Sequence, residues 1–218
     1  MIEVNREMKY VLRRYLLLLI GLSIMAFGVA FSIKADLGTS PISSVPYVVS
    51  LFAPLTVGTA TIVMHCVFIL LQILILRKDY HPIQLLQLPV AFFFGYLTDF
   101  GLWAVQSIRY ESYWQQWILC LIGIFLIAVG VSLEVKAGVV VLAGEGVVLA
   151  ICKVFPVKFG NMKVGFDVIL VAVACVLSLV FTGRLQGIRE GTVAAALLVG
   201  QIAKRLGIFM ERWKIEQI

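Results

Sequence analysis

Long apolar runs alternate with short polar connections along this chain. Six of the runs are about 20 residues long, the length that an α-helix needs to cross the hydrocarbon core of a bilayer. They extend over Tyr15 to Ile33, Gly58 to Leu76, Pro82 to Val105, Trp117 to Val135, Lys163 to Phe181 and Thr192 to Met210. Two shorter apolar pieces, Pro41 to Ala53 and Gly144 to Phe155, are each followed by a proline. The pattern predicts six crossing helices and two re-entrant half-helices.

The composition excludes a soluble domain. Hydrophobic residues make up 61% of the 218 residues and charged residues 14%, whereas a soluble domain is about half apolar and about a quarter charged. The net charge of +6 comes from Lys and Arg at the ends of apolar runs, so it indicates membrane topology and no nucleic-acid partner. We predict an all-α, multi-pass protein of the bacterial cell membrane. Its partners are the lipid bilayer and a small molecule, and the sequence also allows a homo-oligomer.

A basic leader, residues 1–14, precedes the first run. Its basic residues are Arg6, Lys9, Arg13 and Arg14. By the positive-inside rule this leader belongs in the cytoplasm. A basic start followed by small residues at Gly28 and Ala30 is also typical of a cleaved signal peptide. The uncleaved form is favoured because the same apolar segment recurs later in the chain as an internal element.

The second half of the chain repeats the first at an offset of 102 residues. The matched pairs include Gly21 with Gly123, Gly28 with Gly130, Lys34 with Lys136, Pro54 with Pro156 and Gly58 with Gly160. A three-residue change of register then brings Gly95 opposite Gly200. The chain therefore divides into repeat unit 1, residues 15–110, and repeat unit 2, residues 111–218, which ends in a cytoplasmic tail.

Charge decides how the two units are oriented. If each short piece enters the membrane and returns on the same side, each unit has three crossings, and the second unit is inverted relative to the first. This arrangement places most of the 18 basic residues, and both termini, in the cytoplasm. Short pieces that span would leave fewer basic residues inside, so the positive-inside rule favours the inverted repeat.

Two stretches of sequence resemble a known family. The first unit contains Lys34-Ala35-Asp36-Leu37-Gly38-Thr39-Ser40-Pro41, and the second contains Gly187-Ile188-Arg189-Glu190-Gly191-Thr192. Together with the repeat, these two motifs resemble those of the YczE/YyaS/YitT group of bacterial membrane proteins. The resemblance implies a fold type and membrane residence and no particular substrate. The second unit has residues 138–143 in place of Asp36 to Pro41, so any site built from these segments is asymmetric.

The amino ends of the half-helices are candidate binding positions, because exposed helix amides attract anionic groups and unwound carbonyls attract cations. The candidate substrate-binding residues are Lys34, Asp36, Thr39, Ser40, Ser43, Ser44, Lys136 and Glu145. Hydroxyl groups in this position also serve simply to cap a helix. The two lysines could attract an anion or could extend to the membrane interface.

His65 and Asp167 lie inside apolar runs and occupy equivalent positions in the two units. An ionisable side chain inside a bilayer costs roughly 2.5–3.5 kcal/mol and usually faces a partner or a watery cavity. We therefore predict that the two residues pair across the repeat interface, as a proton-coupling relay or as a structural ion pair. Glu134, Asp99 and Glu190 lie near run ends and are expected to be solvated or paired with Arg or Lys.

The leading hypothesis is a small secondary transporter with a midplane site between the repeats. Its substrate would be a small organic anion or zwitterion, coupled to protons. The alternative is a non-transporting membrane protein that binds a lipid or supports another membrane complex. Enzymatic function is not predicted, since the chain has no HExxH, GxSxG or phosphate-loop motif. No cofactor and no metal site are expected, and the four cysteines occur singly.

The inverted topology can be tested by cysteine labelling. In a background that lacks the four native cysteines, Asp79→Cys and Arg109→Cys should react with a membrane-impermeant thiol reagent from opposite sides. One crossing, Pro82 to Val105, separates them. Labelling of both from the same side would contradict the predicted topology.

Overall fold

The computed structural model describes the backbone of residues 2–211 and the side chains of residues 10–210. The chain forms eight α-helices and two short 3-10 helices over this range. They are α1 (Ile2–Lys34), α2 (Pro41–Phe52), α3 (Val57–Leu76), η1 (Arg77–Asp79), η2 (Pro82–Leu86), α4 (Gln87–Val105), α5 (Tyr113–Ala137), α6 (Ala143–Val154), α7 (Phe159–Thr182) and α8 (Glu190–Glu211).

The six predicted crossing helices are confirmed as long apolar helices. Within residues 2–211, six helical segments are long and apolar enough to cross a membrane, and they contain α1, α3, α4, α5, α7 and α8. The two predicted half-helices are α2 and α6, each of 12 residues. A helix of that length extends about 18 Å, well short of a hydrocarbon core of about 30 Å. The order long, short, long, long thus occurs twice.

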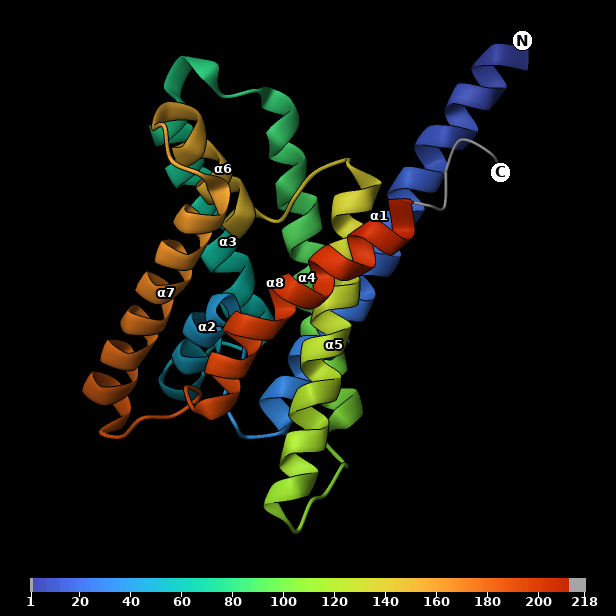
Figure 1. The fold of residues 1–218 in the computed structure, drawn as a ribbon. Helices are drawn as coiled ribbons and strands as arrows, with labels where there is room; N and C mark the ends of the chain where they lie inside the picture. Colours follow the sequence, from blue (N-terminus) through green and yellow to red (C-terminus); the bar gives the residue numbers. More distant parts are fainter. Residues whose placement is uncertain (1, 212–218) are drawn as a thin grey trace.

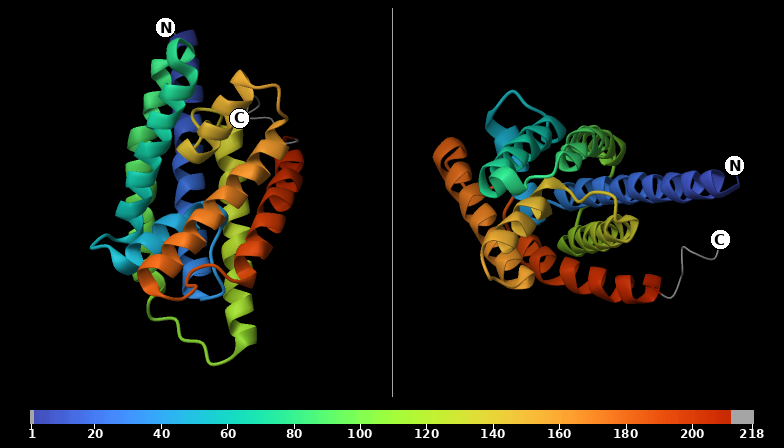
Figure 2. Two further views of the ribbon diagram at one scale, coloured as in Figure 1. Left: turned by 90° about the vertical axis from the view of Figure 1, so that its left-hand side faces the viewer. Right: turned by 90° about the horizontal axis from the view of Figure 1, so that it is seen from above.

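Figure 1 shows how the chain runs between the two ends of the molecule. α1 descends from the end that carries the η1–η2 connection, and α5 climbs back toward that end. The 106–112 and 183–189 connections lie at the opposite end. Two views in Figure 2 show the same arrangement from the side and from above, with α7 and α8 on the outside. The α1 start and the α8 finish lie toward the same end.

Four glycines bring α1 and α5 into backbone contact. A Cβ added at Gly21 would lie 3.0 Å from the Gly130 carbonyl oxygen, and one added at Gly123 would lie 2.7 Å from that of Gly28. Only glycine allows helices to approach so closely. A hydrophobic cluster that includes Leu18, Leu22, Met25, Phe94 and Ile127 surrounds this contact and joins α4 to it.

A second glycine contact joins α3 to α4. A Cβ added at Gly58 would overlap the Gly95 carbonyl oxygen. The Asp99 carboxylate completes the junction, because it accepts a hydrogen bond from Gly58 N at 2.7 Å and one from the Thr56 hydroxyl at 2.6 Å. Thr56 is the N-cap of α3, so a side chain of α4 helps to hold the amino end of α3. Asp99 had been expected to be solvated or to pair with a basic residue; it bonds to this helix end instead.

The corresponding helices of the second half, α7 and α8, lie apart. α7 packs against α2 and α6, whereas α8 packs mainly against α5. A Cβ added at Gly160 of α7 or Gly200 of α8 would meet no other described part of the chain within 4 Å. The two helices are close at the 183–189 connection and diverge toward the opposite end (Figures 1 and 2). The two halves therefore match in element order and differ in this packing.

The glycine contact between α3 and α4 has no counterpart between α7 and α8. Replacing glycine by alanine should therefore change the stability of the protein differently at the matched positions Gly95 and Gly200. Gly95→Ala should lower the thermal unfolding temperature in detergent, because its Cβ would lie 2.7 Å from the Gly58 carbonyl oxygen; overpacking of this kind costs about 1–3 kcal/mol. Gly200→Ala should be neutral or stabilising, because alanine favours a helix by about 1 kcal/mol over glycine. Equal losses in the two variants would contradict the difference in packing.

Candidate functional site

The amino end of α2 is a buried cluster of hydroxyl groups. Ser40 is the N-cap, and its Oγ accepts a hydrogen bond from Ser43 N and lies 3.0 Å from Ser43 Oγ. Ser44 Oγ donates to the Pro41 carbonyl at 2.6 Å. The structure thus brings the predicted residues Ser40, Ser43 and Ser44 together, and their bonds satisfy the end of the helix from within.

The segment that leads into α2, residues 35–40, is tied to the beginning of α8. Thr39 N donates to the Gly187 carbonyl at 3.3 Å, and Arg189 donates to the Asp36 carbonyl at 2.9 Å. The two stretches that carry the family resemblance therefore contact each other. Asp36 lies in this tie, with its side chain exposed. The Thr39 hydroxyl is buried and has no hydrogen-bond partner in the described part of the chain.

Glu134 is buried where α5 ends and the segment into α6 begins. Its residue is only 1% exposed, and Oε1 accepts a hydrogen bond from Leu142 N at 2.5 Å. Leu142 is the N-cap of α6 and has no capping side chain, so Glu134 satisfies this helix end from another helix. The second oxygen, Oε2, has no partner among the described residues. Glu134 was expected to be solvated or to pair with a basic residue, and that expectation is wrong.

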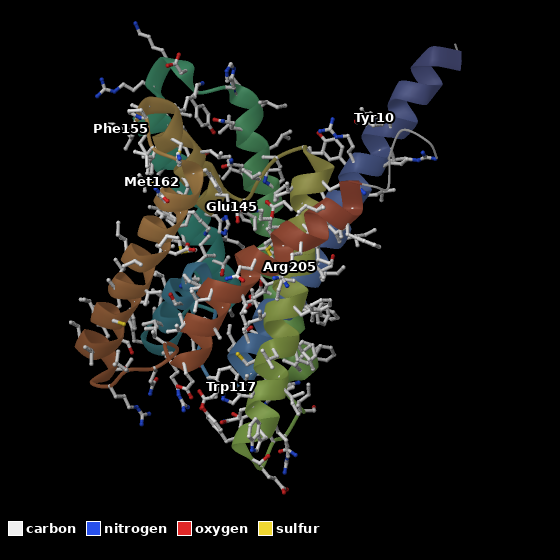
Figure 3. All side chains as sticks on the ribbon, viewed as in Figure 1. Tyr10, Trp117, Glu145, Phe155, Met162 and Arg205 are labelled. Atoms are coloured by element: carbon white, nitrogen blue, oxygen red, sulfur yellow. The ribbon has the colours of Figure 1, made fainter. Side chains whose placement is uncertain are left out.

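Glu145, in the first turn of α6, faces a different set of charges. Its carboxylate interacts electrostatically with Lys163 and Asp167 of α7, and Glu134 interacts electrostatically with Glu145. Lys163 and Asp167 form an ion pair of 2.7 Å one helical turn apart. Figure 3 shows Glu145 toward the centre of the molecule, in the direction in which α7 and α8 diverge. The charges of this ion pair and of the two glutamates thus influence one another at the beginning of α6.

The predicted pairing of His65 with Asp167 is wrong. Asp167 bonds to Lys163, whereas the His65 ring is fully buried and neither of its nitrogens has a partner in the described part of the chain. Its neighbours are the rings of Phe68 and Phe94, each 6.2 Å away between centroids. The physical reason is helix orientation: His65 faces α4, and Asp167 faces α6.

Two glutamines link the first half to α6. Gln72 Nε2 donates to Gln87 Oε1 at 2.8 Å and to the Ala143 carbonyl at 3.1 Å, and Gln87 Nε2 donates back to Gln72 Oε1. Both side chains are buried. A Cβ added at Gly146 would lie 2.6 Å from Gln72 Oε1, so this glycine makes room for the amide. The pair joins α3, α4 and α6 through polar groups.

A cavity of about 340 Å³ lies beside these glutamines. It is lined by α6, the ends of α3 and η2, and the segment 138–141 that leads into α6. Gln87 and Gly146 contribute to its wall, together with Gln84 and Lys153. The Gln84 Oε1 atom is buried without a partner in the described chain. Cavities of roughly 300–1,000 Å³ with a few polar groups are typical of small-molecule sites.

The two predicted binding lysines bond to the ends of other helices. Lys34 Nζ donates to the Gln106 carbonyl at 2.8 Å, where α4 ends, and Lys136 Nζ donates to the Met210 carbonyl at 2.7 Å in the last turn of α8. Cations are favourable at the carboxyl end of a helix. Neither lysine is among the residues that line the cavity beside α6.

Sequence reasoning did not identify Glu134, Gln72 or Gln87 as site residues. Gln72 lies in an otherwise apolar stretch of α3, and its equivalent in the second half is Ala174. A single amide in such a stretch could have identified Gln72 as a candidate site residue. Glu134 has Ser32 as its equivalent. At both positions one half has a large polar side chain where the other half has a small residue. Such pairs indicate where the two halves differ in their contacts.

Six helices that are long and apolar enough to cross a bilayer are the makeup of a multi-pass membrane protein. The chain belongs to the family described as a family of unknown function (DUF6198), whose sequence pattern matches residues 12–207. It is also similar to the uncharacterized protein YyaS of Bacillus subtilis (strain 168), with 29% identity over 124 residues. The aligned part covers 56% of this chain and 60% of YyaS. No solved structure matches the chain significantly.

The role of Glu134 as a remote cap can be measured. Glu134→Ala leaves the buried Leu142 amide without its acceptor, and an unsatisfied buried group costs about 1–3 kcal/mol. Glu134→Gln keeps an oxygen in place and should cost less. The exposed Glu111→Ala serves as a control and should leave the thermal unfolding temperature unchanged. Similar temperatures for Glu134→Ala and Glu134→Gln would contradict the capping role.

Proposed function

We propose that this protein is a small secondary transporter of the bacterial cell membrane, with a substrate site at α6. The observation that carries the proposal is the cavity of about 340 Å³ beside α6, which adjoins the buried Gln72–Gln87 pair. Its size suits a small metabolite. Gln84 Oε1 in the cavity wall and Glu134 Oε2, on the carboxylate that bonds to Leu142, are buried without a partner in the described part of the chain, and they could bond to a substrate or to a proton.

The proposal includes two inverted repeats that move relative to each other. Contacts between matched residues support a twofold relation: Gly21 faces Gly130, and their equivalents Gly123 and Gly28 face each other. The half-helices exchange in the same way, since α2 packs on α7 and α6 packs on α3. Halves related in this manner rock around a central site in known secondary transporters. The positive-inside rule supports cytoplasmic termini.

The substrate class follows from the charges near α6. Glu134 and Glu145 suit a proton or an amine, while Lys163 and the amino end of α6 suit a carboxylate. Within the class of small organic anions and zwitterions, this combination favours a zwitterion. His65 and Asp167 do not pair, so we assign proton coupling to other ionisable groups. Glu134 and Glu145 are the carboxyl groups at the beginning of α6. The resemblance to YczE and YitT is compatible with this role.

The route to the opposite side is covered by the tie between residues 35–40 and the beginning of α8. The cavity lies toward the end of the molecule that carries η2 and Lys153. At the other end, the Thr39–Gly187 and Asp36–Arg189 bonds join the two halves. Release of these bonds would be the step that admits solvent from that side.

A second candidate function is a membrane protein that binds a lipid or supports another membrane complex. It is favoured by one observation, the separation of α7 from α8. Solute uptake into proteoliposomes distinguishes the two candidates, because a lipid-binding or supporting protein moves no solute.

The transporter proposal predicts a ligand that stabilises the purified protein. In a screen of small zwitterions and organic anions, a true ligand at about 100 times its Kd should raise the free energy of unfolding by about 2.7 kcal/mol. Leu149→Trp should abolish this gain by filling the cavity, because Leu149 lines it and is half exposed. Glu145→Gln, in the first turn of α6, should also reduce it.

Two controls separate binding from folding. Each variant without ligand should unfold at a temperature close to that of the wild type, and the exposed Glu111→Gln should respond to ligand normally. Uptake of the ligand into proteoliposomes should require an imposed proton gradient, and Glu145→Gln should remove that requirement or the uptake itself. A ligand that binds but is never taken up would exclude the transporter.

A further inference from the structure

The cavity beside α6 has one charged side chain in its wall, and this side chain is a cation. Among the described residues that line the cavity, only Lys153 of α6 is charged. Its Nζ donates to the Asp79 carbonyl at 3.4 Å, which is longer than the usual distance of about 2.7–3.2 Å. A ligand carboxylate would be a stronger acceptor, because hydrogen bonds between ions are shorter and about twice as strong as those between neutral groups.

A stretch of backbone without hydrogen bonds forms another wall of the cavity. Residues 139–141 line the cavity in the connection between α5 and α6 (Figure 1). Within the described part of the chain, their N–H and carbonyl groups make no hydrogen bond, although all three residues are half-buried. Backbone groups away from bulk water are normally paired. The segment therefore has donors and acceptors available for a molecule in the cavity.

Both ends of this segment are held in place. On one side, Gly138 N donates to the Glu134 carbonyl at 3.2 Å, and the Arg14 guanidinium donates to the carbonyls of Ala137 and Gly138. On the other side, Leu142 N donates to the Glu134 carboxylate. A segment fixed at its ends loses little freedom when a ligand binds, so less of the binding energy is spent on ordering it.

The rest of the wall combines glutamine amides with apolar side chains. Gln87 is already bonded to the glutamine of α3. Gln84 Oε1 is buried and has no partner in the described chain, so an N–H group of a ligand would satisfy it. Leu76, Ile83 and Leu149 also line the cavity and suit a hydrocarbon side chain.

A molecule that complements all of these groups carries a carboxylate, a peptide group and an apolar side chain. A single amino acid would pair with Lys153 and leave residues 139–141 without a peptide partner. We infer that the cavity binds a dipeptide, with its terminal carboxylate at Lys153 and its peptide group hydrogen-bonded to residues 139–141 and to Gln84 Oε1. Unpaired backbone commonly recognises extended peptides in this way. The inference rests on the substrate site proposed above and narrows its zwitterionic substrate to one chemical class.

The first test compares three probes. Glycyl-leucine has the peptide group and the carboxylate, glycyl-leucinamide lacks the carboxylate, and leucine lacks the peptide group. Each probe is added to the purified protein at graded concentrations, and the rise in thermal unfolding temperature gives its apparent Kd. Glycyl-leucine should bind about tenfold or more tightly than either of the others, because each of them loses hydrogen bonds. Equal affinity for leucine, or no binding of glycyl-leucine, would overturn the inference.

The second test separates the carboxylate contact from a structural role of the lysine. Lys153→Gln should weaken the binding of glycyl-leucine about tenfold and leave that of glycyl-leucinamide unchanged. Lys153→Arg should retain most of the affinity for glycyl-leucine. Lys158→Gln, an exposed lysine outside the cavity lining, is the matched control and should bind both probes normally. Equal losses for the two probes in Lys153→Gln would overturn the carboxylate contact.

The third test separates the peptide contact from folding. Gln84 Oε1 has no partner in the described chain, so Gln84→Leu without ligand should unfold at the wild-type temperature or above it. The same variant should bind glycyl-leucine more weakly than the wild type does. Unchanged affinity in Gln84→Leu would overturn the contact between the peptide group and this oxygen.

Uptake into proteoliposomes distinguishes this inference from the proposed function. Glycyl-leucine that binds with these dependences and is not taken up would support the dipeptide site and exclude the transporter. Uptake of a solute without a peptide group, unaffected by Lys153→Gln, would support the transporter and overturn the dipeptide site.

Discussion

The contact between α1 and α5 is the constraint on which the other helices depend. Glycines at the crossing allow backbone against backbone, a spacing that larger residues could not reach. α4 packs on α1 and α8 packs on α5, so both are positioned by this central pair. The pair also carries Glu134, which caps α6. Arg14 of α1 completes the arrangement by donating to the Ala137 carbonyl at 2.7 Å, just before the chain turns toward α6.

The helices could be predicted because a bilayer leaves few alternatives. Backbone groups in hydrocarbon must be paired within the segment, so an apolar run of sufficient length becomes a helix. The short pieces before Pro54 and Pro156 became α2 and α6 within one residue of the predicted ends. The repeat added the equivalence of Gly21 with Gly123 and of Gly28 with Gly130, and these four residues lie in the central contact.

Helix rotation could not be predicted, and the site depends on it. In a soluble protein an apolar stripe identifies the buried face, but here lipid-facing and protein-facing sides are both apolar. The repeat register made His65 and Asp167 equivalent without making them neighbours. Glu134 lies near the end of its helix, a place where carboxylates are usually solvated, and its burial depends on the way the chain folds back over residues 138–142.

The exchange of half-helices bears on how the protein is made. α2 packs against α7 and α6 packs against α3, so neither half contains all of its own packing partners. During synthesis the helices of the first half are inserted in the bilayer before the second half is made. They are individually stable there and pack fully only after α6 and α7 are inserted. The 106–112 connection makes none of these helix contacts. Two fragments divided there would retain every packed surface, and the covalent link would contribute proximity during biogenesis and little to the finished structure.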